Sequence, residues 1–291
     1  PGNLVASVVA LPNNQLLVGG AFTALKTGGT PVYRNRLARV NGDGSVDTSF
    51  DADTGASAGA PVEVVTVQSD GRVLAAGTFA AFGGTNGQNF ARFNLDSTPD
   101  TTFAPTLNGP VYALGQQLTK GEAVSTPKTG FAWLQNNGQL KSFTFPSDVT
   151  VVSVRTVAVQ ADGKVLIAGS FTVGSSSVRT NLLRFQPDGS LDTGFAINDL
   201  NDADEIDDTA AEVYVIQPLS DGKILIGGAF LSIGTTARAN LARLNSDGSL
   251  DTSFTVVTNS TVLAIAVQSD NKILIGGGFT TAQVSGANTS T

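Results

Sequence analysis

Short apolar runs alternate with polar turns along the chain, and the same pair of runs occurs five times. Each first run is rich in β-branched residues and ends at an Asp-Gly or similar turn, after which a second apolar run follows at once. Asp-Gly between two apolar runs predicts a β-hairpin, because glycine accepts the positive φ that a tight turn requires. The first runs are Ser7–Leu11, Val62–Gln68, Val154–Gln160, Val213–Gln217 and Val262–Gln268, and the turns with their second runs are Asn13–Phe22, Asp70–Phe79, Asp162–Phe171, Asp221–Phe230 and Asp270–Phe279.

A second phrase follows four of these hairpins after a variable polar loop. Its typical form is Asn-Leu-Ala-Arg-Leu-Asn, an Asp-Gly-Ser turn and Asp-Thr-Ser-Phe, which predicts a third strand and a short fourth segment. Four short antiparallel strands in a unit of about 45–55 residues are typical of a propeller blade. The second phrases are Arg36–Phe50, Asn89–Phe103, Asn181–Phe195 and Asn240–Phe254.

The spacing of the repeats sets the expected number of blades. A degenerate unit, Val111–Phe145, keeps four strand-like segments but loses the consensus. We therefore predict an all-β fold, a single β-propeller domain over residues 1–291 with six blades of four antiparallel strands; seven blades are the alternative. The units are expected near residues 5–58, 62–106, 110–146, 152–197, 211–256 and 261–291, the last one incomplete. We expect these residues to be part of a longer chain whose upstream segment supplies the missing strands.

The paired phrases resemble the delta-sixty repeat, a bacterial β-propeller family described as a domain of unknown function. The resemblance rests on the hairpin phrase, such as Asp221–Phe230, and on the second phrase, such as Asn240–Phe254, and it covers nearly the whole chain. It implies a large secreted or cell-surface protein, often carrying a C-terminal sorting domain exported by type IX secretion. It implies no catalytic residues.

Composition excludes several kinds of site. The chain has no His, Cys or Met, which rules out Ser-His-Asp and Cys-His triads, zinc sites built on His or Cys, and disulfide bonds. A net charge of −7 argues against nucleic acid and anionic membranes as partners. No apolar run approaches the roughly 20 residues of a membrane helix, so direct membrane insertion is not expected.

Charged residues that recur in every complete repeat are interpreted as structural. Each third strand carries an arginine and each fourth segment an aspartate, a combination suited to bidentate pairing between neighbouring strands. The alternative, a ring of ligand-binding charges, fits fourfold recurrence less well. The pairs are Arg39 with Asp47, Arg92 with Asp100, Arg184 with Asp192, and Arg243 with Asp251. The aspartates of the Asp-Gly turns are interpreted as turn formers.

One acidic insertion occurs once and is the candidate metal site. Oxygen ligands at Asp199, Asn201, Asp202, Asp204, Glu205, Asp207 and Asp208 suit calcium, which takes six to eight oxygens. The spacing does not match an EF-hand loop, and a solvated acidic loop is the alternative. Calcium is the one cofactor that the sequence suggests.

Two aromatic residues are candidate ligand-binding residues. Tyr33 lies in a long variable loop beside Arg34, and Trp133 is the sole tryptophan, in the degenerate unit. Arginines also occupy the Arg34 position in other repeats, at Arg179 and Arg238, which favours a structural role for the arginine. A blade-core position is the alternative for Trp133.

These observations favour an extracellular, non-enzymatic binding or display module of a bacterial surface protein that contacts a glycan or a protein. The alternatives are a structural spacer in a surface fibre and a propeller-type polysaccharide hydrolase or lyase. The third is the weakest, because the glutamates lie in non-equivalent contexts and no carboxylate pair stands out.

Overall fold

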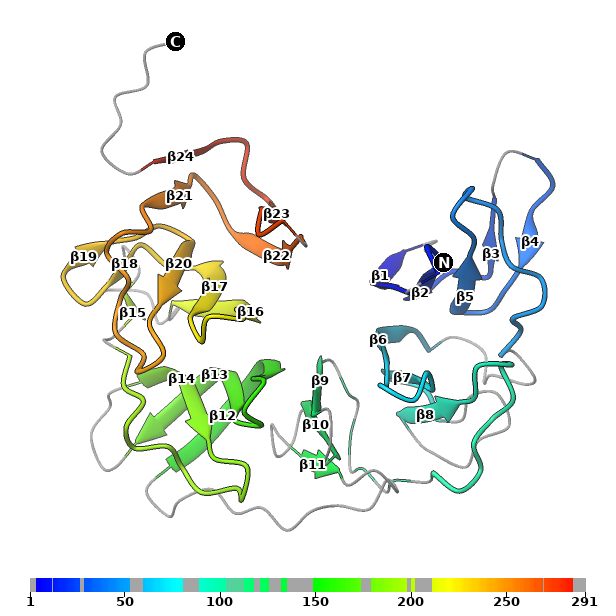
Figure 1. The fold of residues 1–291 in the computed structure, drawn as a ribbon, viewed down its shortest axis with the longest axis horizontal. Helices are drawn as coiled ribbons and strands as arrows, with labels where there is room; N and C mark the ends of the chain where they lie inside the picture. Colours follow the sequence, from blue (N-terminus) through cyan, green and yellow to red (C-terminus); the bar gives the residue numbers. More distant parts are fainter. Residues whose placement is uncertain are drawn as a thin grey trace. The chain divides into compact units, whose positions relative to one another are not determined.

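The computed structural model describes residues 4–11, 13–26, 29–52, 60–80, 89–103, 113–117, 121–125, 132–134, 149–173, 179–197, 200–201, 211–268 and 270–284, with the single residues 105, 107, 109 and 111. All regular structure in these residues is β-strand, as the sequence predicts. The chain forms two compact units, residues 1–142 and 143–291, and the boundary lies near the end of the degenerate repeat, Val111–Phe145 (Figure 1).

The described residues of the first unit form three three-stranded antiparallel sheets and one outer hairpin. The first two sheets have the second strand of the repeat in the middle, and the third has β10 in the middle. The sheets are β1 (Val5–Ala10), β2 (Leu16–Gly20) and β5 (Leu37–Val40); β6 (Val62–Val67), β7 (Val73–Gly77) and β8 (Phe90–Phe93); and β9 (Ala113–Gln117), β10 (Gly121–Ser125) and β11 (Ala132–Leu134), while the hairpin is β3 (Ala24–Leu25) and β4 (Val32–Tyr33). The first three of the four segments predicted for the degenerate repeat are therefore confirmed as strands, and the fourth, Gln139–Phe145, lies outside the described residues.

The second unit repeats the arrangement. Two of its sheets have three strands around the second strand of the repeat, and the last described repeat forms a sheet of two. They are β12 (Val149–Val159), β13 (Val165–Val173) and β14 (Arg179–Phe185); β16 (Glu212–Pro218), β17 (Ile224–Ala229) and β20 (Leu241–Leu244); and β22 (Val262–Val267) with β23 (Ile273–Gly277).

The fourth segment of each complete repeat is shorter than a regular strand. It contacts the end of the third strand through a single antiparallel bridge, and the chain then turns again at the following Asp-Thr. The bridges join Val40 to Val46, Phe93 to Pro99, Phe185 to Leu191, and Leu244 to Leu250.

Connecting segments link consecutive repeats of the second unit through small outer sheets. β15 (Leu200–Asn201) leaves one repeat and pairs with β18 (Ser232–Ile233) of the next, which in turn pairs with β19 (Thr236–Ala237). In the same way β21 (Val256–Thr258) pairs with β24 (Ala282–Val284). The outgoing connector of one repeat is thus a strand in the outer sheet of the following one.

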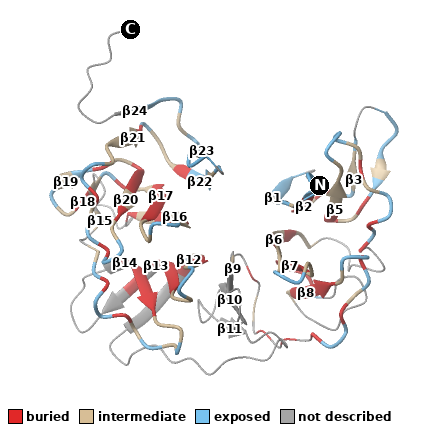
Figure 2. Cartoon of the chain, in the orientation of Figure 1, coloured by how far each residue is buried: buried red, intermediate tan, exposed pale blue. Residues whose placement is uncertain are grey.

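The hydrophobic core lies between the faces of consecutive sheets (Figure 2). Leu17 and Leu37 of the first repeat pack with Val62 and Val65 of the second. Phe22, Phe79, Phe171 and Phe230, which end the hairpin phrase, are all buried, and Phe279 is partly buried. The fold is therefore held together by contacts between neighbouring repeats as well as within them.

The glycine pair at the end of the second strand allows this close packing. A Cβ on Gly227 would lie 2.6 Å from Val262 Cγ1 of the next repeat and 2.9 Å from Val215 Cγ1. A Cβ on Gly228 would overlap the carbonyl oxygen of Glu212, beside the β-bulge between Val213 and Val215. The glycine pair therefore permits an approach of the neighbouring repeat and of the adjacent backbone that a side chain would prevent.

We predict that Gly227→Ala destabilises the fold, because the added methyl group has no space against Val262. The expected loss is about 1–3 kcal/mol of unfolding free energy, measured by urea denaturation. Gly276→Ala is the matched control: it occupies the same position in the last described repeat, where the nearest atom to a new Cβ is that of Ala264 at 3.9 Å. Equal losses in the two variants would contradict the proposed packing constraint.

Candidate functional site

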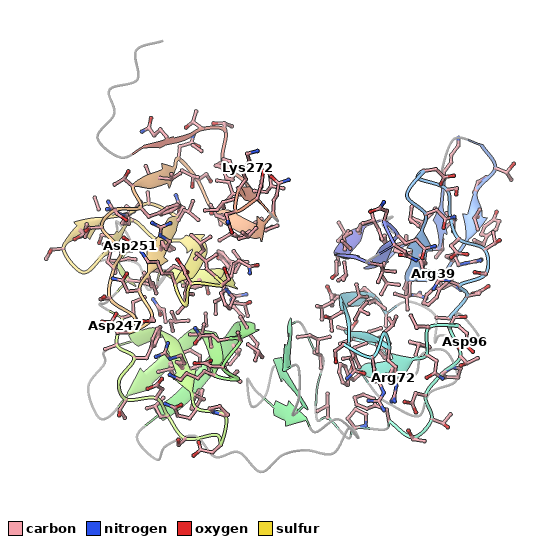
Figure 3. All side chains as sticks on the ribbon, viewed as in Figure 1. Arg39, Arg72, Asp96, Asp247, Asp251 and Lys272 are labelled. Carbon is pink, nitrogen blue, oxygen red and sulfur yellow. The ribbon has the colours of Figure 1, made fainter. Side chains whose placement is uncertain are left out.

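The predicted arginine–aspartate pairs are present in all four complete repeats, and we call each pair a brace. Two of them show the geometry: Arg39 Nε donates to Asp47 Oδ2 at 2.8 Å, and Arg243 Nε donates to Asp251 Oδ2 at 2.7 Å (Arg39 and Asp251 are labelled in Figure 3). The other two braces join Arg92 to Asp100 at 2.9 Å and Arg184 to Asp192 at 2.8 Å. Each guanidinium also lies over the phenylalanine that ends the phrase, 4.2–4.9 Å from the ring centroid.

A second basic residue completes three of the braces. It comes from the Asp-Gly turn between the first two strands: Arg72 pairs with Asp100, Lys164 with Asp192, and Lys223 with Asp251. In the first repeat Gln15 Nε2 donates to Asp47 instead, at 3.1 Å. A basic residue recurs two positions after the turn aspartate in these three repeats, and this spacing is the signal in the sequence for the contact.

The other carboxylate oxygen of the brace aspartate fixes the last turn of the phrase. Asp251 Oδ1 accepts hydrogen bonds from the backbone N and the hydroxyl of Ser253, at 3.0 and 2.6 Å. Ser49 and Thr102 make the same two contacts with Asp47 and Asp100. One carboxylate therefore joins the third strand, a turn and, in three repeats, the hairpin cation.

These contacts lower the pKa of the brace aspartates. The hydroxyl of Ser49, assisted by Arg39, lowers the pKa of Asp47 to about 2, against an opposing effect of burial. Lys223 is the main cause of the lowered pKa of Asp251, followed by Ser253 and Arg243. Burial raises the pKa of Asp100 and Asp192, but hydrogen bonds from their partners outweigh it. The carboxylates are therefore ionised over the physiological range, as an ion pair requires.

Two brace arginines also reach the next repeat. Arg39 Nη1 donates to the backbone oxygen of Leu95 at 3.1 Å, and Arg184 Nη1 donates to that of Ser246 at 2.6 Å. Leu95 and Ser246 occupy the same position, directly after the asparagine that follows the third strand. The recurring arginines therefore make structural contacts within and between repeats. The alternative, a ring of ligand-binding charges, does not fit these contacts.

The turn aspartates act as the sequence predicts. Asp43 Oδ1 accepts a hydrogen bond from the backbone N of Ser45, and the same i to i+2 contact occurs at the other predicted positions, Asp70, Asp162, Asp188, Asp221 and Asp247. The glycine after each of these aspartates has a positive φ.

A different arginine supports the outer hairpins. Arg34 is buried and donates to the backbone oxygens of Phe50 and Thr48, at 3.1 and 3.0 Å, as well as to that of Tyr33. Arg238 makes the equivalent contacts with Ala237 and Thr252 in the fifth repeat. The structural role expected for these two arginines is confirmed.

Tyr33 is the exposed aromatic residue that this arrangement displays. It lies on β4, directly before the anchored Arg34, and its side chain is 77% exposed. The fifth repeat has Ala237 at this place, so the fold holds the backbone here and leaves the side chain free to vary. Loops on a rigid scaffold commonly carry recognition, and such a position is a candidate ligand contact.

The other sequence candidates fall mainly outside the described residues. Of the acidic segment, only Asn201 is described, on β15; Asp199, Asp202, Asp204, Glu205, Asp207 and Asp208 are not, so the calcium site stays a prediction. The backbone of Trp133 lies on β11, and its side chain is outside the description. Within the part of the chain that the structure covers, no group of three acidic residues is placed to hold a metal ion. The same part contains no helix long and apolar enough to span a membrane.

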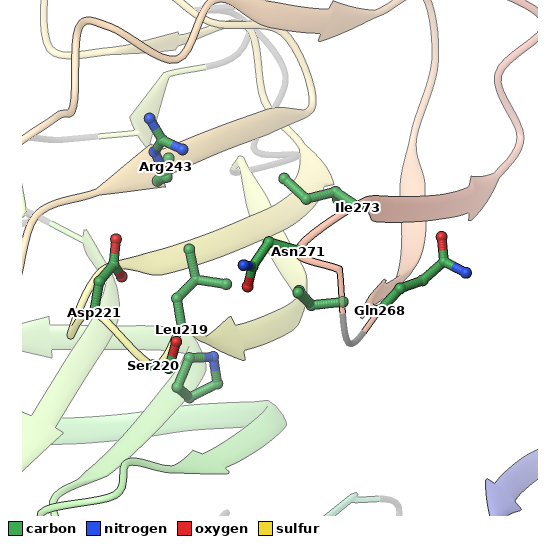
Figure 4. A pocket seen from close by; sticks show the side chains of 9 residues that line it. Leu219, Ser220, Asp221, Arg243, Gln268, Asn271 and Ile273 are labelled. Atoms are coloured by element: carbon green, nitrogen blue, oxygen red, sulfur yellow. The ribbon is translucent and has the colours of Figure 1, made fainter.

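A groove of about 470 Å³ lies beside the hairpin turns of the fifth and sixth repeats (Figure 4). Leu219, Asp221 and Arg243 line one side, and Gln268, Asn271 and Ile273 line the other. The sequence does not predict this groove, because the residues that line it belong to the repeated phrases. They differ from the equivalent residues of other repeats only in the neighbouring segments that pack over them.

Comparison with known families identifies the repeats. The family model described as domain of unknown function (DUF5122) beta-propeller matches residues 11–50, 68–103, 160–195, 219–254 and 268–290, which together are more than half of the chain. The comparison with curated proteins gave no match.

Comparison with solved structures agrees on the fold. The WD40 beta propeller domain of Doa1 has a TM-score of 0.59 at 15% identity, covering 95% of this chain and 76% of that one. The extracellular domain of a putative hybrid two component system from B. thetaiotaomicron has a TM-score of 0.54 at 13% identity, covering 96% and 40%. Virginiamycin B lyase from Staphylococcus aureus has a TM-score of 0.50 at 12% identity, covering 94% and 84%. At these identities the likeness establishes a propeller fold and nothing about activity.

We predict that Asp251→Ala lowers the unfolding free energy by about 3 kcal/mol, because it leaves Arg243 and Lys223 without their shared carboxylate. Urea denaturation is the measurement. Asp247→Ala is the control: it removes an exposed turn aspartate four residues away, with a much smaller expected loss. If the two variants unfold at the same urea concentration, the brace does not stabilise the protein as argued.

The lowered pKa values also predict an acid limit to stability. Asp47 titrates near 3.8 when unfolded and near 2 when folded, so the folded protein binds fewer protons in this range. The contribution of the ionised Asp47 carboxylate to the unfolding free energy is complete above about pH 4 and is lost as the pH falls through 2. Urea midpoints measured at pH 6, 4, 3 and 2 are expected to be nearly constant down to about pH 4 and then to fall. The urea midpoint of the Asp47→Asn variant is expected to fall less steeply with decreasing pH. A wild-type midpoint that is unchanged at pH 2 would refute the stabilising role assigned to the ionised Asp47.

Proposed function

The chain belongs to the domain of unknown function (DUF5122) beta-propeller family, and on that premise we propose that it is an extracellular, non-enzymatic binding module that contacts a glycan or a protein. The delta-sixty name and the type IX export that it implies are part of this proposal. The family itself assigns no activity, so the proposal rests on how the structure divides its residues between holding the fold and facing solvent.

The observation that carries the proposal is the contrast between Arg34 and Tyr33. The arginine is held by three backbone oxygens, while the tyrosine beside it is exposed on the hairpin that the arginine fixes. An aromatic ring on a fixed backbone binds at a low cost in conformational entropy, and it stacks well on sugar rings or apolar protein surfaces. The brace residues, in contrast, are already engaged by one another.

The proposed extracellular location rests on two weaker supports. One is the family resemblance, whose members are secreted or attached to the cell surface. The other is that one of the similar structures is described as an extracellular domain. Antibodies raised against the hairpin Ala24–Tyr33 are expected to label intact cells of the source organism, and labelling only after lysis would contradict the location.

We predict that Tyr33→Ala weakens ligand binding about tenfold or more without changing thermal stability, because the side chain is exposed and touches little of the fold. A glycan array and a set of surface proteins identify the ligand with the wild-type protein, and titration then compares variants. Leu231→Ala, an exposed leucine near the outer hairpin of the fifth repeat, is the control and is expected to bind normally.

Two outcomes would replace the proposal. Absence of any ligand on the array and among the surface proteins would favour the structural spacer. Turnover of a polysaccharide that is abolished by one carboxylate substitution would favour a hydrolase or lyase.

A further inference from the structure

The first strand of every repeat that carries the hairpin phrase has a β-bulge at the same position. The bulged residue is Arg155 in β12 and Tyr214 in β16, and it lies between two residues that pair with the second strand. A β-bulge leaves its extra residue unpaired and re-aims the side chain, and bulges are common beside functional sites. The five bulged residues are Ala6, Glu63, Arg155, Tyr214 and Leu263. The repeat thus keeps the backbone at this position and does not keep the side chain.

Two bulged residues meet in the second unit, where β12 and β16 are neighbouring strands (Figure 1). Arg155 Nη2 donates to Glu212 Oε1 at 2.8 Å, and the guanidinium carbon of Arg155 lies 5.8 Å from the centroid of the Tyr214 ring. A hydrogen bond with Glu212, assisted by burial, raises the pKa of the Tyr214 phenol, so the hydroxyl is protonated at neutral pH. Glu212 therefore contacts both bulged residues, and we call Arg155, Glu212 and Tyr214 the bulge cluster.

The fold does not require the charges of the bulge cluster. At the position of Glu212 the repeat constrains the backbone oxygen, which would overlap a Cβ on Gly228. The side chain at this position differs in other repeats, which carry Leu4, Pro61 and Thr261. The side chains of Arg155 and Glu212 are 50% and 26% exposed, and an ion pair exposed to this degree contributes little to stability. A role in recognition accounts for the cluster better than stabilisation does.

The groups that the cluster presents suit an uncharged ligand rich in hydroxyl groups. Within the described part of the chain, Nε and Nη1 of Arg155 have no acceptor and can donate to ligand hydroxyls. The Glu212 carboxylate accepts hydrogen bonds, and the partly buried Tyr214 ring offers an apolar surface for C–H groups. Because the guanidinium and the carboxylate balance in charge, an anionic ligand is repelled by Glu212 and a cationic ligand by Arg155. A neutral sugar ring combines hydroxyls with apolar C–H faces and avoids both costs.

We propose that the bulge cluster is a binding site for a neutral sugar residue of a saccharide. The guanidinium and the carboxylate bind neighbouring hydroxyls, and the Tyr214 ring contacts the C–H groups beside them. The site uses none of the residues of the hairpin that displays Tyr33. It therefore goes beyond the binding function proposed above and does not depend on it.

The test is isothermal titration calorimetry of the whole 291-residue protein with cellohexaose, xylohexaose, mannohexaose and maltohexaose, and with hexagalacturonate as the anionic counterpart. Saturable binding of at least one neutral oligosaccharide is expected, with hexagalacturonate bound about tenfold more weakly or not at all. No saturable binding of any neutral oligosaccharide, or tighter binding of hexagalacturonate, would overturn the proposal.

Single substitutions locate the bound saccharide. Tyr214→Ala and Glu212→Ala are each expected to weaken binding about tenfold or more. Lys272→Ala is the matched control, because it removes one partner of another exposed ion pair of the second unit, and it is expected to bind as the wild type does. Tyr33→Ala is also expected to leave this binding unchanged. Binding that is lost in Tyr33→Ala and retained in Tyr214→Ala would belong to the Tyr33 contact, and this inference would then be wrong.

A charge exchange separates recognition from a purely structural ion pair. The double variant Arg155→Glu with Glu212→Arg keeps one charge of each sign at the two positions, so its urea midpoint is expected to stay near that of the wild type. Its affinity for the same oligosaccharide is expected to fall about tenfold or more, because the carboxylate no longer lies beside the Tyr214 hydroxyl. Wild-type affinity in the exchanged variant would show that the pair does not contact the sugar.

Discussion

The brace aspartate is the contact on which each complete repeat depends. Its Oδ2 accepts a hydrogen bond from the arginine of the third strand. In every complete repeat except that of Asp192, its Oδ1 also accepts hydrogen bonds from a hydroxyl and a backbone N–H. A nearly buried charge is costly to place unless such partners surround it, and removal of one partner leaves the others unpaired. The arginine, the turn and the aspartate therefore have to be retained together, which accounts for the close repetition of the second phrase.

This constraint separates the residues that build the fold from those that are free to recognise something. Arginines and aspartates that recur are engaged within a repeat or, as at Arg39 and Arg184, between repeats. Side chains at the outer hairpins have no such role, and Tyr33 and Ala237 differ there although the backbone below them is anchored in the same way. Specificity in such a scaffold is expected to reside in residues that the repeat does not share.

Much of the fold can be predicted from the sequence because each pattern, weak evidence by itself, recurs in several repeats. The hairpins, the turn aspartates and the Arg–Asp pairs each recur at a fixed spacing, so one interpretation had to fit four or five places. The two-residue outer strands could not be predicted, since Leu200–Asn201 and Ser232–Ile233 have no periodicity and pair only because folding brings them together. The Arg243 groove was missed for a related reason: its residues are those of any repeat, and only the neighbouring sheet distinguishes them.

Because of the outer sheets, a sheet does not always begin and end within one repeat. β15 and β21 each leave one repeat and hydrogen-bond within the next, so a cut between two central sheets removes a strand from the repeat that follows. Deletion or grafting of a single repeat would then expose an unpaired hairpin edge on the retained part. A transferable module would have to begin at the preceding connector, before Leu200 or Val256, and end before the next one. Recombination among such genes is expected to favour crossover points between the end of the second phrase and the connector over points that separate a connector from the repeat that follows it.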